Sequence, residues 1–195
     1  MECGTQFSLY PMTDRFVEVI LPAVEKLKAR DSLEIVTDDL STLVRGDAAE
    51  VFSAIRDAFI AAAASGSHVV ANVLFSRGCP GEEQCEAEAG AAQGDDAQEA
   101  RLDPTGGAPR VEAAAQYSLY PLGREDYMEQ IYDAVAGAKE TGTFARSKNF
   151  CTRLDGPADK LFETIFESFV GAPASHAVIH ATISANSPSQ KGETR

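Results

Sequence analysis

An internal repeat constrains the fold of this chain more than any other feature of its sequence. Three blocks occur twice, in the same order and at a nearly constant offset: QFSLYPM (6–12) and QYSLYPL (116–122), STLVRGDAAEVFSAI (41–55) and CTRLDGPADKLFETI (151–165), SHVVANVLFSRGCP (67–80) and SHAVIHATISANSP (175–188). The matches include irregular features such as Tyr-Pro and a terminal proline, and not only a hydrophobic period. The sequence therefore indicates two copies of a unit of roughly 75 residues.

Each copy is predicted to contain two helices and four strands. Strands are expected at 7–12, 33–37, 40–45 and 69–76 in the first copy. Helices are expected over 14–28, with Thr13 as N-cap, and over 47–63. In each expected helix, apolar residues spaced by three and four form one face. These residues are Phe16, Val19, Ile20, Val24 and Leu27 in the first helix and Val51, Phe52, Ile55, Phe59 and Ala62 in the second. With the same order in the second copy, the expected fold class is α+β: two tandem ferredoxin-like (βαββαβ) repeats, each an antiparallel sheet with two helices on one face.

Composition separates the two copies. Residues 80–112 carry nine acidic and two basic side chains, and they contain few branched or aromatic residues. Such a composition buries too little apolar surface to order a segment. The expected organisation is a first repeat at 1–80, a flexible acidic linker at 81–112, a second repeat at 113–190 and a disordered tail at 191–195.

The expected fold leaves one face of each sheet uncovered, and a core of this size is marginal on its own. Pairing of two repeats, within the chain or across a dimer, would cover these faces. We therefore expect either a pseudo-dimeric monomer or a homodimer, and the homodimer is favoured.

Charge and cysteine content restrict the partners and the compartment. The formal charge of −13 disfavours nucleic acid, because phosphate backbones repel an acidic surface. Apolar runs are too short for membrane insertion, and the N-terminus lacks the features of a secretion signal. Four cysteines without a CxxC pair predict reduced thiols, a cytoplasmic protein and no structural zinc.

Residues for catalysis are few. No nucleophile motif, HExxH or glycine-rich phosphate loop occurs in the sequence. Cys79 and His180 are the candidates for a small enzyme, but their counterparts in the other copy are Ser187 and Asn72. A duplicated catalytic site would not tolerate these differences easily, so structural roles are favoured for both.

Polar residues recur within the apolar strands. Ser8 and Tyr10 recur as Ser118 and Tyr120, and the Asp39–Thr42 segment recurs as 149–152. In a ferredoxin-like sheet the first and third strands are neighbours, so these groups come together. An aromatic ring beside carboxylate, amide and hydroxyl groups suits a flat heterocycle, although ordinary sheet hydroxyls and a tyrosine at a strand end would give the same pattern.

The blocks CGTQFSLYPM, TDDLSTLVRG, VLFSRGCPG, QYSLYPL and SANSPS resemble the YkoF-related family of thiamine- and hydroxymethylpyrimidine-binding proteins. The resemblance covers both repeats. It implies a cytoplasmic dimer of tandem ferredoxin-like repeats that binds the vitamin or its pyrimidine at one site per repeat, without catalysis and without a separate cofactor. It also implies a role in uptake or salvage of thiamine precursors, with a transporter as a possible partner. The alternatives left open are a ligand-sensing regulatory module and an enzyme using Cys79 or His180.

Ten residues are the predicted ligand contacts under this resemblance. They are Tyr10, Asp39, Ser41, Thr42 and Cys79 in the first repeat, and Tyr120, Asn149, Cys151, Thr152 and Asn186 in the second. The first repeat has Asp38-Asp39 where the second has Lys148-Asn149. Unequal affinities of the two sites are therefore expected.

Overall fold

A computed structural model describes residues 1–79 and 101–189 of the chain. Its elements are β1 (Glu2–Pro11), α1 (Phe16–Lys28), β2 (Glu34–Thr37), β3 (Thr42–Asp47), α2 (Ala48–Ala63), β4 (Val69–Arg77), β5 (Glu112–Leu122), α3 (Tyr127–Glu140), β6 (Phe144–Lys148), β7 (Cys151–Pro157), α4 (Ala158–Gly171) and β8 (His176–Ala185). The order βαββαβ occurs twice, which confirms the predicted tandem ferredoxin-like fold.

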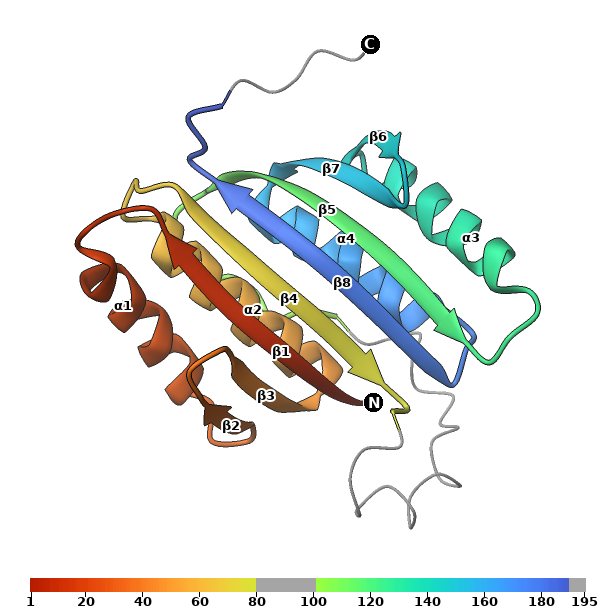
Figure 1. Ribbon diagram of the computed structural model, residues 1–195, viewed down its shortest axis with the longest axis horizontal. Coiled ribbons are helices and arrows are strands. Elements are labelled where there is room, and N and C mark those ends of the chain that lie inside the picture. Colours follow the sequence, from red (N-terminus) through yellow and green to blue (C-terminus); the bar gives the residue numbers. More distant parts are fainter. Residues whose placement is uncertain (80–100, 190–195) are drawn as a thin grey trace.

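The two repeats share one sheet. Its eight strands lie in the order β2-β3-β1-β4-β8-β5-β7-β6, and every neighbouring pair is antiparallel. β4 and β8, the last strands of the two repeats, pair along their length at the centre (Figure 1). Val73 lies opposite Ala181, and these residues occupy equivalent positions in the two copies. An approximate two-fold axis therefore passes through the centre of the sheet, and pairing removes two exposed strand edges.

All four helices cover the same face of the sheet (Figure 1). Alternate residues of the central strands are buried against them, for example Val73 and Phe75 on β4. Phe52 of α2 stacks on Phe75 with ring centroids 3.7 Å apart and meets Phe166 of α4 edge-on at 5.2 Å. The predicted apolar face of α2 is buried, and its aromatic residues join the two repeats in one core.

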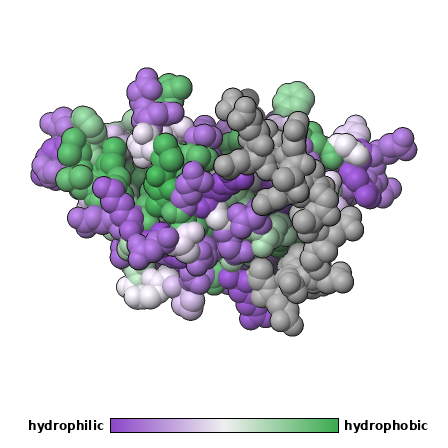
Figure 2. All heavy atoms as spheres, turned by 90° about the horizontal axis from the view of Figure 1, so that it is seen from below, coloured by the Kyte–Doolittle hydropathy of each residue, from purple (hydrophilic) through white to green (hydrophobic). Residues whose placement is uncertain are grey.

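The other face of the sheet, here called the open face, is not covered by the helices and strands of the described residues. Of the two expected ways to cover it, pairing of the repeats within the chain does not do so, because the repeats join edge to edge rather than face to face. Pairing across a homodimer stays an expectation. Tyr10, Leu74 and Tyr120 remain 49%, 39% and 48% exposed. When the molecule is seen from below, hydrophobic side chains gather toward the end that repeat 1 occupies (Figure 2).

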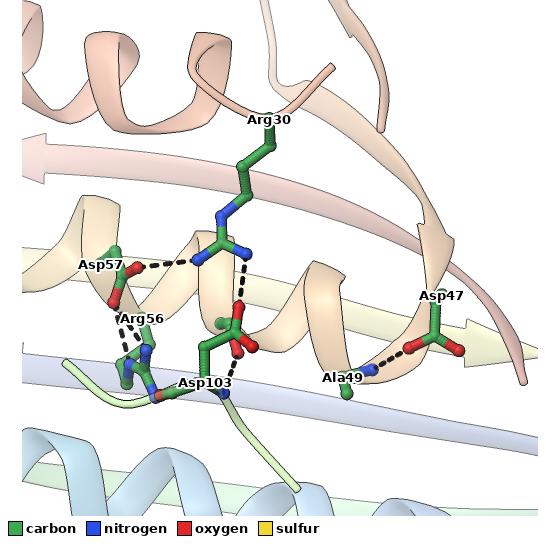
Figure 3. Close-up of polar contacts among 7 residues, drawn as sticks. Arg30, Asp47, Ala49, Arg56, Asp57 and Asp103 are labelled. Carbon is green, nitrogen blue, oxygen red and sulfur yellow. Dashed lines mark hydrogen bonds and ion pairs between the residues drawn. The ribbon is translucent and has the colours of Figure 1, made fainter. Parts of the chain in front are cut away.

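The start of α1 differs from the prediction. The helix begins at Phe16 with Arg15 as N-cap, and Thr13 makes no capping bond to it. Phe16 lies in the first turn and is 51% exposed, so the buried face consists of Val19, Ala23 and Leu27. Helix α2 instead has a side-chain cap, since Asp47 accepts a hydrogen bond from the Ala49 amide at 3.0 Å (Figure 3).

Residues 101–111 were expected to belong to the flexible linker, but they pack on α2. Arg56, only 2% exposed, donates to the Asp103 carbonyl oxygen at 2.7 Å. Arg30 bridges the carboxylates of Asp57 and Asp103 at 2.9 and 2.8 Å (Figure 3). The Asp103 amide donates to Ser53. These contacts fasten the start of the second repeat to the helical layer; the preceding part of the expected linker and the expected tail lie outside the described residues.

No helix in the described ranges has the length and apolarity needed to cross a bilayer.

Candidate ligand site on the open face

Strand alternation places the recurring polar residues on the open face. Gln6, Ser8 and Tyr10 of β1 lie opposite Leu74, Asn72 and Val70 of β4, and none of these six side chains is buried. The intervening residue Phe7 faces the helices. Repeat 2 presents the equivalent Gln116, Ser118 and Tyr120 on β5, opposite Thr182, His180 and Val178 of β8.

The loop between β2 and β3 is tied to this surface in repeat 1. The Ser8 hydroxyl donates to the Leu40 carbonyl oxygen at 3.0 Å, and the Ser41 hydroxyl donates to Gln6 Oε1 at 2.6 Å. The Asp38 carboxylate accepts from the amides of Ser41 and Leu40 at 2.9 and 2.8 Å. These two bonds, that from Ser41 first, hold the pKa of Asp38 below its usual value. The loop therefore lies beside Ser8, on the same face as Tyr10.

Repeat 2 builds the same attachment with different side chains. Ser118 donates to the Phe150 carbonyl oxygen at 2.7 Å, as Ser8 does to Leu40. Gln116, however, accepts from the Lys148 ammonium at 2.7 Å rather than from a neutral hydroxyl. Phe150 is 95% exposed and has a φ of +69°. A bulky residue in this conformation is unfavourable, and the Ser118 bond helps to hold it.

The two sites meet at the centre of the sheet. His180 Nε2 lies 3.3 Å from Asn72 Oδ1 across the β4–β8 pair, and these two residues occupy equivalent positions in the repeats. His68, at the entry to β4, lies 3.0 Å from the Ser184 hydroxyl.

Six of the ten predicted contacts lie on the open face or in its loops. Tyr10 and Tyr120 project from β1 and β5, and Cys151 begins β7 beside Lys148. The remaining three, Asp39, Ser41 and Asn149, lie in the loops that Ser8 and Ser118 hold.

The other four do not join this site. Thr42 lies opposite Phe7, and Thr152 lies opposite Tyr117, so both belong to the helix-facing side. Cys79 follows the end of β4 that pairs near Gly4, at the opposite end of β1 from Tyr10. Asn186 donates from Nδ2 to the carbonyl oxygens of Ala63 and Ser67, which is a structural role.

Sequence reasoning left out the two glutamines. Gln6 and Gln116 open the same repeated block as the two tyrosines, and each is the acceptor that holds a side chain of the adjacent loop or strand. Their recurrence was visible in the sequence. Their direction toward the loops was not, because it depends on the register between β1 and β3 and between β5 and β7.

Two hollows lie on the helical side of the molecule. One of about 130 Å³ separates α3 from α4 and is bordered by Gln130, Gly137 and Glu167. Another of about 230 Å³ lies between residues 101–111, here called the connector, and the start of α4. Neither includes a residue of the repeated open-face set.

These features define a class: a duplicated ferredoxin-like protein whose repeats share one antiparallel sheet and present the same polar and aromatic residues twice. The chain belongs to the YkoF-related family, whose model matches residues 2–82 and 112–190. It is 38% identical over 190 residues to a Bacillus subtilis (strain 168) protein named "Putative HMP/thiamine-binding protein YkoF", covering 96% of this chain and 92% of that protein. The family assignment made from the repeated blocks is confirmed.

Proposed function

We propose that this protein binds thiamine or its hydroxymethylpyrimidine moiety without catalysis, one molecule per repeat, on the open face. The name of the Bacillus subtilis relative supports the ligand class. The observation that carries the location is the duplicated hydrogen bond from Ser8 to Leu40 and from Ser118 to Phe150. In both repeats it fixes a loop beside one glutamine and one tyrosine.

The chemistry of the surface fits an aminopyrimidine. Such a ring carries an amino donor and two ring acceptors, which serine hydroxyls and glutamine or asparagine amides can pair. Tyr10 or Tyr120 offers an exposed aromatic face for stacking. The thiazolium of thiamine is a cation, and Asp38 and Asp39 in the repeat 1 loop supply negative charge for it.

The biological setting we propose is uptake or salvage of thiamine precursors in the cytoplasm. Assembly as a homodimer is part of this proposal, and it would cover exposed apolar side chains of the open face such as Leu74. A transporter for thiamine precursors is the partner that such a role implies.

Calorimetric titration with thiamine and with hydroxymethylpyrimidine tests the proposal. We expect two equivalents to bind per chain. Tyr10→Leu and Tyr120→Leu should each weaken one of the two sites about fivefold, since an aromatic stacking contact contributes about 1 kcal/mol. Tyr132→Leu is the matched control, because Tyr132 is an exposed tyrosine on α3 at the helical side. Absence of binding, or equal effects of all three substitutions, would contradict the proposal. Chemical change of the ligand during incubation would favour an enzyme instead.

A further inference from the structure

The two helices of repeat 2 face each other across the hollow of about 130 Å³ between α3 and α4. On each helix the residues that line it are spaced by three and four, so they form one helical face. They are Gln130, Asp133, Ala134 and Gly137 on α3 and Thr164, Glu167, Ser168 and Gly171 on α4. The hollow therefore follows the contact between the two packed helices.

The buried wall of this hollow is polar, whereas the equivalent positions of repeat 1 are apolar. The buried residues of α1 and α3 have the same spacing, so Val19 corresponds to Gln130. The repeated blocks on α2 and α4 give two further pairs. The buried pairs are Val19 and Gln130, Ala54 and Thr164, and Ala58 and Ser168. A hollow with polar walls admits water and polar guests, whereas apolar walls keep a cavity dry.

Two carboxylates at the opening of the hollow lack a counterion. The buried wall is satisfied internally; for example, Ser168 donates to the Thr164 carbonyl oxygen at 2.9 Å. In the part of the chain that the structure describes, however, neither Asp133 nor Glu167 forms a hydrogen bond or an ion pair. Burial, followed by the nearby Glu163 carboxylate, raises the pKa of Glu167. Negative charge from both helices is thus available at this opening.

Repeat 1 supplies a guanidinium of its own to the equivalent carboxylate. Asp57 corresponds to Glu167, and it binds Arg30 at 2.9 Å and Arg56 at 2.8 Å (Figure 3). Arg30 also binds a second carboxylate, so one guanidinium joins two acidic side chains. In repeat 2 the position of Arg56 is taken by Phe166, and the turn after α3 contains no arginine. Repeat 2 therefore keeps the carboxylate of this arrangement without the cation.

Two glycines leave room beside these carboxylates. Gly137 lies within α3 and Gly171 ends α4, and a Cβ atom added at either would meet no atom within 4 Å. Glycine inside a helix is less stable than alanine, so packing gives no reason for Gly137. Repeat 1 has Lys26 at the equivalent position. The space that a longer side chain would occupy is open in repeat 2.

We propose that repeat 2 binds a small organic cation with a guanidinium head between α3 and α4, held by Asp133 and Glu167. Guanidinium groups form paired, charge-assisted hydrogen bonds with carboxylates. A cavity of about 150 Å³ admits benzene, so the guest here has at most about six non-hydrogen atoms. Among the described residues no group of three or more acidic, histidine or cysteine side chains could hold a metal ion, which favours an organic cation. The site lies on the helical side, and the inference does not rest on the proposed function.

NMR titration of the full chain with methylguanidinium tests the site, with N-methylurea as a neutral probe of the same shape. Methylguanidinium should shift the amide signals of Gly137 and Gly171, and methylurea should bind about tenfold more weakly or less, because it lacks the charge. Glu167→Gln should weaken methylguanidinium about fivefold or more. Glu25→Gln is the matched control, because it removes an exposed carboxylate from α1 in the other repeat and should leave the affinity within about twofold.

A second variant fills the hollow while the carboxylates stay in place. Gly137→Leu should abolish binding and should unfold at no lower urea concentration, because leucine favours the helix and a side chain has room there. Thiamine should neither shift the two glycine signals nor compete with methylguanidinium. Equal binding of methylurea, unchanged affinity in Glu167→Gln or Gly137→Leu, or the same loss in Glu25→Gln as in Glu167→Gln would overturn the cation site. Competition by thiamine would overturn its separation from the open-face site.

Discussion

Asp38 and Asp39 are neighbours in the β2–β3 loop, but only one of them holds the loop together. Asp38 accepts both backbone hydrogen bonds that shape it, whereas Asp39 is exposed and stands at the position of Asn149 in repeat 2. A carboxylate that shapes the loop and one that we propose to face the ligand are therefore adjacent. Substitution of each by asparagine separates the two roles.

Asp39→Asn should weaken thiamine about threefold at repeat 1 and affect the neutral pyrimidine alcohol less. A partly exposed carboxylate near a cation contributes about 0.5–1 kcal/mol, and added salt should reduce the difference. Repeat 1 should accordingly be the better site for thiamine. Asp38→Asn, in contrast, should weaken both ligands, because it loosens the loop. Calorimetry at two salt concentrations measures both effects. Equal weakening of the two ligands by Asp39→Asn would mean that this carboxylate pairs the pyrimidine edge or is structural.

The cysteines offer a probe of the repeat 2 site. Burial raises the pKa of the Cys3 thiol to about 12, so at pH 8 it stays protonated and should resist iodoacetamide. Cys151 is partly exposed beside Lys148, and Cys79 is exposed away from the site. We expect saturating ligand to slow alkylation of Cys151 at least fivefold and to leave Cys79 unchanged, as followed by peptide mass spectrometry. Equal protection of both thiols would place the ligand elsewhere or indicate a global change.

At the scale of elements, the repeated blocks were sufficient to predict the order of helices and strands and the buried face of α2. They were not sufficient to predict which face of the sheet the Thr42 side chain lies on. Leu43 and Val44 are adjacent apolar residues on β3, one on each face, so the alternation that would assign Thr42 to a face is ambiguous until β1 fixes the register.

The pairing of β4 with β8 also could not be predicted from the sequence. Both strands read as edge strands of separate units, and alternation says which face is buried but not which edges meet. The placement of Asn186 away from the open face could not be predicted for a related reason. It adopts a φ of +55° and bonds to Ser67, while its counterpart Gly78 adopts +66° and closely approaches Ser175, the counterpart of Ser67. The two positions therefore share a left-handed backbone conformation.

The connector supplies a prediction at this scale. Arg56→Ala should lower the free energy of unfolding by about 2–3 kcal/mol, because it leaves the Asp103 carbonyl oxygen and Oδ1 of Asp57 without their buried donor, while Arg30 still pairs with Oδ2 of Asp57. Arg110→Ala removes an exposed pair with Glu112 and should cost less than about 0.5 kcal/mol. Urea unfolding compares the two variants. Equal small effects would show that the connector contributes little to holding the second repeat.

At the scale of the whole molecule, the approximate two-fold axis places two similar sites on one continuous surface. The connector packs on the helical side, and the proposed ligand surface lies on the other side. Substitutions in the segment between the repeats should therefore change the stability of the helical layer more than the ligand affinity of the proposed sites. Electrostatic effects on ligand affinity are the exception. Residues 80–100 carry seven acidic and no basic side chains, and the whole chain has a formal charge of −13.

Replacement of residues 80–100 by a Gly/Ser segment of equal length should leave thiamine affinity within twofold at 0.15 M salt. Charges more than about 8 Å from a ligand are largely screened at this ionic strength, and no residue of this segment belongs to the repeated open-face set. Length is kept because a shorter linker could strain the packed repeats. Extending the replacement through residue 111 should instead lower the urea midpoint, since it removes the Asp103 contacts. Calorimetry and urea unfolding of both variants make the comparison. A loss of more than tenfold in affinity for the first variant would show that this segment contributes to the site, and the division of the chain into two repeats and a separate linker would be wrong.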